Sequence, residues 1–289
     1  MMKTAAKYLL GAVALAASGT APAMAADIYE PAVIETPAYS PPEVMPAKVS
    51  GWYLRGDVGY AWHRTMDATY AIADTGPTLI EAALYGESFR GSYTIGAGAG
   101  YKFNNYLRAD LTLDWWGNGR FTGHTYGTCD YGGGPEACTS TDIATFSALT
   151  LMANAYVDFG TYGRFTPYAG GGFGGSYVHW GTLENEACLD SDSANCQTFY
   201  HGGKYEYRFA YALMAGVSVD VSCKLAADVG YKFQHIASGS MFGTVANAGY
   251  GRDSGITSHQ VKAGLRYKFG ACQPAPEPVY IPEPLPVYK

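Results

Sequence analysis

Apolar and polar side chains alternate along most of the chain between residues 51 and 269. A period of two is typical of β-strands whose two faces meet different surroundings. In 52–60, for example, the even positions are mostly apolar, whereas Arg55 and Asp57 fall on the opposite face. The pattern predicts eight strands, which lie at 52–60, 91–103, 107–115, 146–159, 165–178, 205–221, 224–234 and 260–269.

The connections between these strands favour one architecture. Four long polar segments are expected to be loops: 63–89, 118–144, 179–204 and 237–256. Tight turns separate them, at Asn104, 160–164 and Ser222-Cys223. Soluble β-sandwiches rarely tolerate four such loops, whereas outer-membrane barrels combine long loops outside the cell with short turns in the periplasm.

We therefore predict an all-β fold for residues 51–270, an eight-stranded antiparallel up-and-down transmembrane β-barrel with four long extracellular loops and short periplasmic turns. Only a closed barrel satisfies every backbone polar group in lipid. Because the number of strands is even, both termini would lie in the periplasm of a bacterium whose outer membrane holds the barrel.

The two ends of the chain differ from this alternating region. Lys3 and Lys7 precede an uncharged apolar run at 8–18, which is too short for a membrane-spanning helix. Small residues follow at Ala23 and Ala25. Residues 1–25 are thus predicted to be a secretory signal peptide that is cleaved between Ala25 and Ala26.

Proline-rich segments flank the predicted barrel at 26–50 and 271–289. Such segments are extended and semi-rigid, and they lack the apolar periodicity that a packed core needs. They are predicted to be periplasmic tails.

Aromatic residues are expected to form belts at both edges of a lipid-facing surface, where one side of each ring is wet. The belt at the outer ends of the strands would contain Trp62, Trp115, Trp116 and Trp180. The belt toward the turns would contain Tyr101, Phe103, Phe159, Phe165, Phe233 and Phe269.

The net charge of the chain is −6, and it becomes more negative once Lys3 and Lys7 are removed with the signal peptide. Nucleic acid is therefore not expected as a partner, since no basic surplus is left to neutralise phosphates. The four long segments contain twelve acidic residues, namely Asp67, Asp74, Glu81, Glu87, Asp130, Glu136, Asp142, Glu184, Glu186, Asp190, Asp192 and Asp253. These residues could form an acidic outer crown that associates with lipopolysaccharide through divalent cations.

Six cysteines in an exported chain suggest disulfides, because the periplasm is oxidising. The predicted topology places the cysteines in three pairs, each on one side of the membrane: Cys129 with Cys138, Cys188 with Cys196, and Cys223 with Cys272. A metal site is the alternative, but the chain has no Cys-x-x-Cys spacing and its histidines are scattered.

Charged residues fall on the inward face of the predicted strands. Eight strands enclose room only for side chains, so opposite charges should pair and fill the lumen, although a narrow pore remains an alternative. The expected lumen charge network consists of Arg55, Asp57, Arg108, Asp110, Asp114, Asp158, Arg208, Asp220, Asp228, Lys232, Lys262 and Arg266, and inward positions at Lys224 and Lys268 are also basic.

No catalytic, cofactor-binding or metal-binding residues are predicted. The glycines at 96–100 lie inside a strand rather than before a helix, so they do not resemble a phosphate-binding loop. Asp190, Asp192 and Asn195 lack the spacing of a calcium loop. His235 and Ser238 are the best catalytic pair, but no carboxylate is placed to orient the histidine.

Three stretches, at 51–60, 166–172 and 261–269, resemble opacity-protein-like outer-membrane barrels, and most of all the small major outer-membrane proteins of alphaproteobacteria such as Brucella and Rhizobium. The resemblance implies that the aromatic ending at Phe269 is read by the barrel-assembly machinery. It also implies that Ala26-Asp27 attaches covalently to peptidoglycan, since related barrels begin with Ala-Asp.

The expected role is structural, as a surface protein that contributes to the integrity of the envelope and contacts outer-membrane lipid and lipopolysaccharide. Adhesion through the extracellular loops is the alternative. A lipid A hydrolase acting through His235 and Ser238 is a third candidate, but the two residues are not spaced as they are in the small barrel enzymes of that kind.

Overall fold

A computed structural model describes residues 50–65, 67–73, 79–243 and 248–272. By its contacts the chain divides into Met1–Val44 and Met45–Lys289, and all described residues belong to the second unit. The predicted signal peptide, the cleavage site at Ala25 and Ala26, the attachment residues Ala26 and Asp27, and most of both proline-rich tails lie outside the described residues.

The described residues form thirteen strands, and no helix among them is long and apolar enough to cross a membrane. The strands are β1 (Gly51–Thr65), β2 (Ala68–Ala73), β3 (Leu79–Ala83), β4 (Tyr85–Arg90), β5 (Ser92–Lys102), β6 (Leu107–Cys129), β7 (Glu136–Asp158), β8 (Phe165–Trp180), β9 (Leu183–Leu189), β10 (Cys196–His201), β11 (Lys204–Asp220), β12 (Leu225–Phe242) and β13 (Ala248–Lys268).

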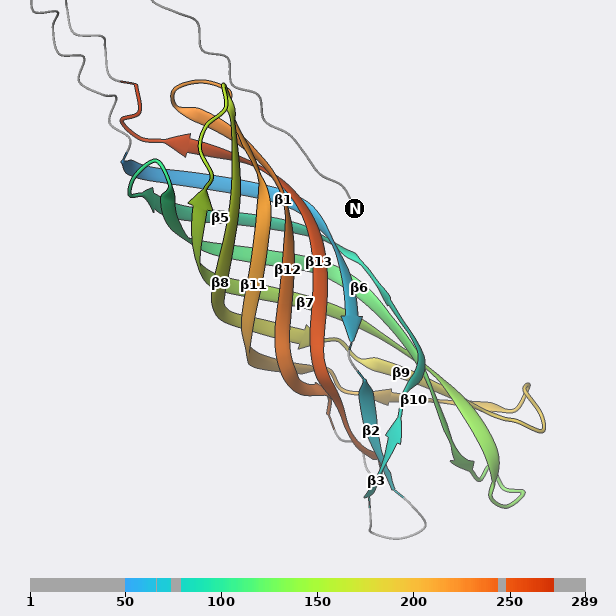
Figure 1. The fold of residues 1–289 in the computed structure, drawn as a ribbon. Coiled ribbons are helices and arrows are strands. Elements are labelled where there is room, and N and C mark those ends of the chain that lie inside the picture. Colours follow the sequence, from blue (N-terminus) through green and yellow to red (C-terminus); the bar gives the residue numbers. More distant parts are fainter. Residues whose placement is uncertain (1–49, 66, 74–78, 244–247, 273–289) are drawn as a thin grey trace, which may run out of the picture. The chain divides into compact units, whose positions relative to one another are not determined.

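Eight of these strands close into a ring, in the order β1-β5-β6-β7-β8-β11-β12-β13 (Figure 1). The ring closes where β13 pairs with β1, with Ala263 opposite Val58. Every pairing in the ring is antiparallel, so no β-strand edge of the barrel wall is left unpaired. The prediction of an eight-stranded antiparallel barrel is confirmed, and the glycine-rich strand at 165–178 is one of its members.

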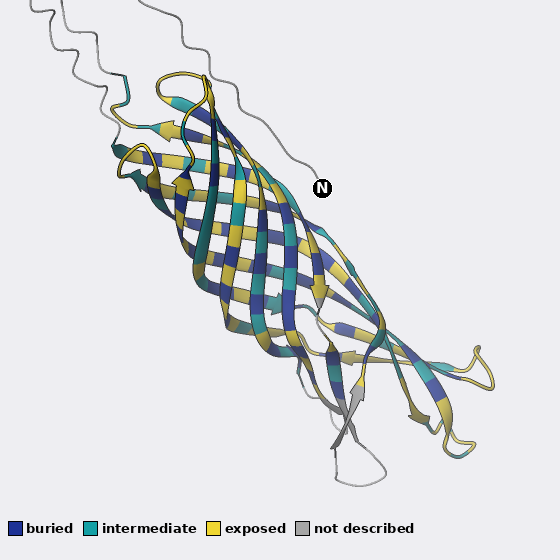
Figure 2. Cartoon of the chain, in the orientation of Figure 1, coloured by how far each residue is buried: buried dark blue, intermediate teal, exposed yellow. Residues whose placement is uncertain are grey.

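Residues of the barrel wall alternate between buried and exposed along each strand (Figure 2). Large apolar side chains point outward, so that Val58 is 58% exposed and Leu213 is 61% exposed. Charged side chains such as Arg108 and Asp110 point inward and are buried. Since a continuous apolar exterior would be unstable in water, this wall is suited to contact with lipid.

Three tight turns join ring strands at one end of the barrel, which we call the turn end. They comprise residues 103–106, 159–164 and 221–224, at the predicted positions. In the first turn, the Asn104 side-chain oxygen accepts hydrogen bonds from the backbone N–H groups of Tyr106 and Leu107, both at 2.8 Å. The side chain thus replaces a backbone partner where the chain reverses.

The opposite end, which we call the hairpin end, differs from the prediction of four long loops. Most of 63–89, 118–144, 179–204 and 237–256 is β-structure. Strands β6 and β7 continue far beyond the length that a bilayer requires, and β9 and β10 extend the sheet beside β7. The loop prediction was wrong because small and polar residues hide the alternation there, while the backbone still pairs with its neighbours.

The six cysteines form disulfides in the three expected pairs: Cys129–Cys138, Cys188–Cys196 and Cys223–Cys272. The first closes the tip of the β6–β7 hairpin, and the second links β9 to β10. The third connects the last tight turn to the residues that follow β13 at the turn end. Two disulfides therefore stabilise the hairpin end, and the third fixes the residues after β13 to the last tight turn.

The inward glycines of β8 make room for large side chains on β7. A Cβ atom at Gly172 would meet the Asn154 side chain, and one at Gly170 would meet the ring of Tyr156. At Gly174 a Cβ atom would clash with the carbonyl oxygen of Leu151, which is backbone and cannot move aside. The glycine-rich sequence of this strand thus follows from close packing inside a narrow barrel.

Gly174→Ala is expected to lower the free energy of unfolding by about 1–3 kcal/mol, because the added methyl group overpacks the interior. Gly171→Ala is the matched control, since its Cβ atom would face outward with no atom closer than 3.6 Å. Urea unfolding of the refolded protein, followed by heat-modifiable gel mobility, measures the difference. Equal midpoints for the two variants would contradict this account of the packing.

Candidate functional site in the barrel interior

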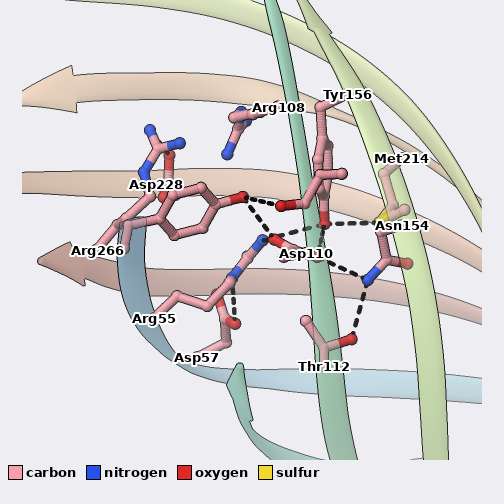
Figure 3. Close-up of polar contacts among 12 residues, drawn as sticks. Arg55, Asp57, Arg108, Asp110, Thr112, Asn154, Tyr156, Met214, Asp228 and Arg266 are labelled. Atoms are coloured by element: carbon pink, nitrogen blue, oxygen red, sulfur yellow. Dashed lines mark hydrogen bonds and ion pairs between the residues drawn. The ribbon is translucent and has the colours of Figure 1, made fainter. Parts of the chain in front are cut away.

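A network of buried charges occupies the part of the lumen nearer the turn end (Figure 3). Arg55 on β1 contacts Asp57 at 2.7 Å and Asp110 on β6 at 3.1 Å. Tyr53 and Asn154 also donate hydrogen bonds to the Asp110 carboxylate, at 3.1 and 2.8 Å. Because these groups come from three strands, the carboxylate of Asp110 ties different parts of the wall together.

Asp114 is the second centre of the network. Its two carboxylate oxygens accept hydrogen bonds from Lys232 at 2.8 Å and from Lys262 at 2.6 Å. All three side chains are largely buried. The ammonium groups come from β12 and β13, on the far side of the ring from β6, so this contact spans the lumen.

Arg108 lies between two aromatic rings, with its guanidinium carbon 4.4 Å from the ring centre of Tyr156 and 4.5 Å from that of Tyr168. Its Nε atom donates a hydrogen bond to Asp158 at 3.0 Å. A guanidinium that is both paired and stacked on aromatic faces is stabilised without water.

Closer to the turn end, Arg266 contacts Asp228 at 3.3 Å. At the rim itself, Lys268 contacts Asp220 at 2.7 Å, and the Asp220 side chain is 44% exposed. Lys224 is exposed in the adjoining turn rather than inward. We define the charged tier as Arg55, Asp57, Arg108, Asp110, Asp114, Asp158, Asp228, Lys232, Lys262 and Arg266.

Arg208 lies outside this tier, although it was expected within the network. It contacts Asp253 at 2.7 Å and Glu206 at 3.1 Å, near the hairpin end.

Asp253 was expected in an exposed acidic crown but is buried. Asp142 is also buried, and it accepts hydrogen bonds from Asn185 and Ser140. Burial raises the pKa of the Asp142 carboxyl, and these hydrogen bonds oppose that effect. Asp142 and Asp253, two members of the predicted acidic crown, are therefore buried and hydrogen-bonded rather than exposed.

Apolar side chains fill the lumen beyond the charged tier, toward the hairpin end. The rings of Phe146 and Trp180 are 5.0 Å apart, and those of Phe121 and Phe242 each lie 5.6 Å from Trp180. We define the aromatic plug as Trp116, Phe121, Phe146, Trp180 and Phe242, around which Ile236, Met241 and Ile256 are also fully buried.

The prediction that four tryptophans form the outer aromatic belt was wrong for two of them. Trp62 and Trp115 are exposed on the outer surface, but Trp116 and Trp180 are completely buried in the lumen. Neighbouring residues of a strand face opposite sides, so Trp115 and Trp116 could not both face lipid. Phe233 was predicted in the belt toward the turns. It pairs with His259, which pairs with Trp62 on the other side, so Phe233 lies toward the hairpin end of the wall.

Free space in the charged tier lies in two places. At the turn end, a cavity of about 230 Å³ is lined by Tyr53, Asp158 and Arg266, among other residues. In the middle of the tier, a cavity of about 30 Å³ is lined by Asp114, Tyr156 and Lys262, among other residues. Such a volume holds only one or two water molecules. Past the cavity at the turn end, the interior is thus a packed polar core, followed toward the hairpin end by a packed apolar core.

The sequence prediction missed the neutral members of the interior. Tyr53, Asn154, Tyr156 and Tyr168 hold the charges through hydrogen bonds and ring faces, and all four are buried. Their positions in the alternation already placed them on the inward face, which is the signal that could have identified them.

The remaining candidate residues do not assemble into a reactive group. His235 lies within hydrogen-bond distance of Thr257, at 3.3 Å, and Ser238 is exposed. Asp190 accepts a hydrogen bond from Thr139, and Asp192 accepts one from the backbone of Ala194. Among the residues that the structure describes, no group of histidine, cysteine or acidic side chains could hold a metal ion.

Asp114→Asn is expected to lower the free energy of unfolding by about 3–5 kcal/mol, because two buried ammonium groups lose their shared carboxylate. Asp220→Asn is the control, since that half-exposed rim pair should contribute no more than about 1 kcal/mol. Urea titration of the protein in lipid vesicles compares the variants. If both variants unfold at the same denaturant concentration, the charge balance described for Asp114 is wrong.

The chain has relatives among curated proteins. Curated relatives from Brucella abortus and Brucella suis, both uncharacterized proteins, are 34% identical over 284 residues, which covers 86% of this chain and 93% of theirs. A Rickettsia conorii protein whose name proposes an adhesin is 26% identical over 178 residues, covering 59% of this chain and 65% of its own.

Two solved structures are similar at low identity. Neisserial surface protein A is 18% identical, with a TM-score of 0.39 over 76% of this chain and 99% of its own. The outer membrane protein OprG from Pseudomonas aeruginosa is 14% identical, with a TM-score of 0.41 over 76% of this chain and 97% of its own. A family model described as the outer membrane protein beta-barrel domain matches residues 11–269. The chain therefore belongs to the family of outer-membrane β-barrel proteins.

Proposed function

We propose that this protein is a structural component of the bacterial outer membrane, which contributes to envelope integrity through its lipid-embedded wall. One observation carries the proposal: the interior is filled from the charged tier to the aromatic plug. A filled barrel offers no aqueous path for solutes, so the surfaces left for function are the apolar wall and the two ends.

In the proposed orientation, the hairpin end faces the cell exterior and the turn end faces the periplasm. The short turns and the longer, disulfide-closed hairpins agree with how such barrels are built. Outer-membrane lipid and lipopolysaccharide are the partners of the wall, and the barrel-assembly machinery would act on the chain during insertion. The proposal includes no catalytic step.

The proposed structural role extends to the cell wall. Ala26 would be the mature N-terminus and the point of attachment to peptidoglycan, and the proline-rich residues that follow would be the tether. The family resemblance and the Ala26-Asp27 sequence support this part of the proposal. Such a link would hold the outer membrane at a fixed distance from the wall.

Adhesion is a second candidate, and exposed aromatic side chains at the hairpin end favour it. Phe199 and Tyr200 on β10 are 45% and 63% exposed, and Tyr126 on β6 is also exposed. Aromatic side chains that lie in water outside a lipid-facing surface are typical of protein interfaces. The proposed adhesin role of the Rickettsia relative points the same way.

A strain that lacks this protein is expected to become more sensitive to chelators and detergents, because the membrane loses an embedded, wall-linked component. The wild-type gene should restore resistance, and so should a Phe199→Ser/Tyr200→Ser variant, whose changes are confined to the exposed surface. Unchanged sensitivity in the deletion strain, with loss of cell binding in the serine variant, would favour adhesion instead.

Sacculi boiled in detergent are expected to retain the protein until muramidase releases it, because a covalent bond at Ala26 survives denaturation. Replacement of Asp27 by lysine supplies a comparison, since it alters the residue beside the proposed linkage while leaving the barrel unchanged. Complete release of the wild-type protein by detergent alone would rule out the attachment.

A further inference from the structure

Three arginines lie on the outer surface of the barrel just beyond its lipid-facing band. Arg64 is on β1, Arg90 is on β4 and Arg120 is on β6, and all three are exposed. The residue next to each one, respectively His63, Phe89 and Phe121, packs against the interior. Because successive residues of a strand face opposite sides, the three guanidinium groups project outward.

The same inward neighbours show that the three strands are adjacent at this level. The ring of Phe89 lies 5.1 Å from that of His63 and 6.1 Å from that of Phe121. In the pairing of β4 with β6, Arg90 stands directly opposite Arg120. The three arginines therefore form one row across three strands, which we call the arginine row.

Like charges that stand directly opposite each other destabilise a sheet. Within the described residues, no ion pair joins Arg64, Arg90 or Arg120 to a carboxylate. The residue opposite Arg120 on β7 is Thr145, which is neutral. Glu87, the acidic residue of β4, alternates to the other face and accepts a hydrogen bond from the backbone of Ala68. The cross-strand pair of Arg90 and Arg120 thus lacks a neutralising partner within this part of the chain.

The height of the arginine row agrees with the position of lipid headgroups. Trp62 and Trp115 are 51% and 49% exposed and lie two and five residues from Arg64 and Arg120 along their strands. Exposed tryptophan marks the interface between hydrocarbon and water. At about 3.3 Å per residue along a strand, Arg64 lies roughly 7 Å beyond Trp62 on β1, and Arg120 lies roughly 17 Å beyond Trp115 on β6, so the row lies on the water side of that interface.

We infer that the arginine row binds the phosphate groups of a phosphorylated outer-leaflet glycolipid, of the lipid A type. Guanidinium groups match phosphate oxygens in fork geometry, and two opposed arginines can bind one phosphate between them. Thr145, opposite Arg120 on β7, is neutral and adds no charge that would compete with the phosphate. This inference rests on the proposed orientation of the hairpin end toward the cell exterior, and it names a lipid contact that needs no divalent cation.

The test uses the full-length protein in a zwitterionic detergent and lipid A that carries two phosphates. Native mass spectrometry measures lipid binding by the wild type and by Arg90→Gln/Arg120→Gln. The variant should bind this lipid at least about tenfold more weakly, which corresponds to loss of a single charge-assisted contact. The same acylated disaccharide without phosphate should bind both proteins equally weakly.

The matched control is Arg164→Gln/Lys224→Gln, which removes the same charge from exposed positions at the turn end and should bind like the wild type. Without lipid, Arg90→Gln/Arg120→Gln should unfold no more readily than the wild type, because like-charge repulsion is removed. Wild-type affinity in that variant, or equal binding of lipid with and without phosphate, would overturn the inference. Either result leaves the structural role standing, since the sensitivity of the deletion strain does not depend on these arginines.

Discussion

The hydrogen bonds between neighbouring strands form a closed ring, and this closure shapes both the wall and the interior of the protein. Lipid offers no partner to a backbone N–H or C=O group, so the wall must satisfy all of them within itself. Pairing of β13 with β1 achieves this by removing the last free edge of the ring. Once the ring is closed at eight strands, its two faces must differ. Apolar side chains face lipid, and the side chains of the alternate positions face a lumen that is too narrow for a channel.

The content of the lumen follows from that confinement. A buried charge without a partner is costly, so each inward arginine and lysine of the charged tier meets a carboxylate, as Asp114 does with Lys232 and Lys262. Trp116 follows Asp114 by two residues on the same inward face, and there the filling becomes apolar. Along β6 the inward side chains therefore change from paired charges to packed aromatic rings, and both kinds fill the lumen.

The two rims of the barrel differ in how far their strands extend. At the hairpin end, β6 and β7 continue past the bilayer and carry β4, β9 and β10 with them. Beyond Gly91, β4 continues the pairing of β5 with β6 in the same register, and it sets Arg90 opposite Arg120, five residues past the exposed Trp115. On a chain whose net charge is negative, this extension of the sheet places two positive charges side by side on the outer surface, where the proposed glycolipid phosphates would bind.

Alternation and connection order are local properties, and they were enough to predict the eight strands, the face of each side chain within them, and the cysteine pairs. Alternation also implied that Trp116 faces away from Trp115. Which charges meet could not be predicted in this way. Lys262 is 148 residues from Asp114 in the chain, and Arg208 pairs with Asp253 rather than with the charged tier. Such partners depend on the register of strands around a closed ring, which no local pattern encodes.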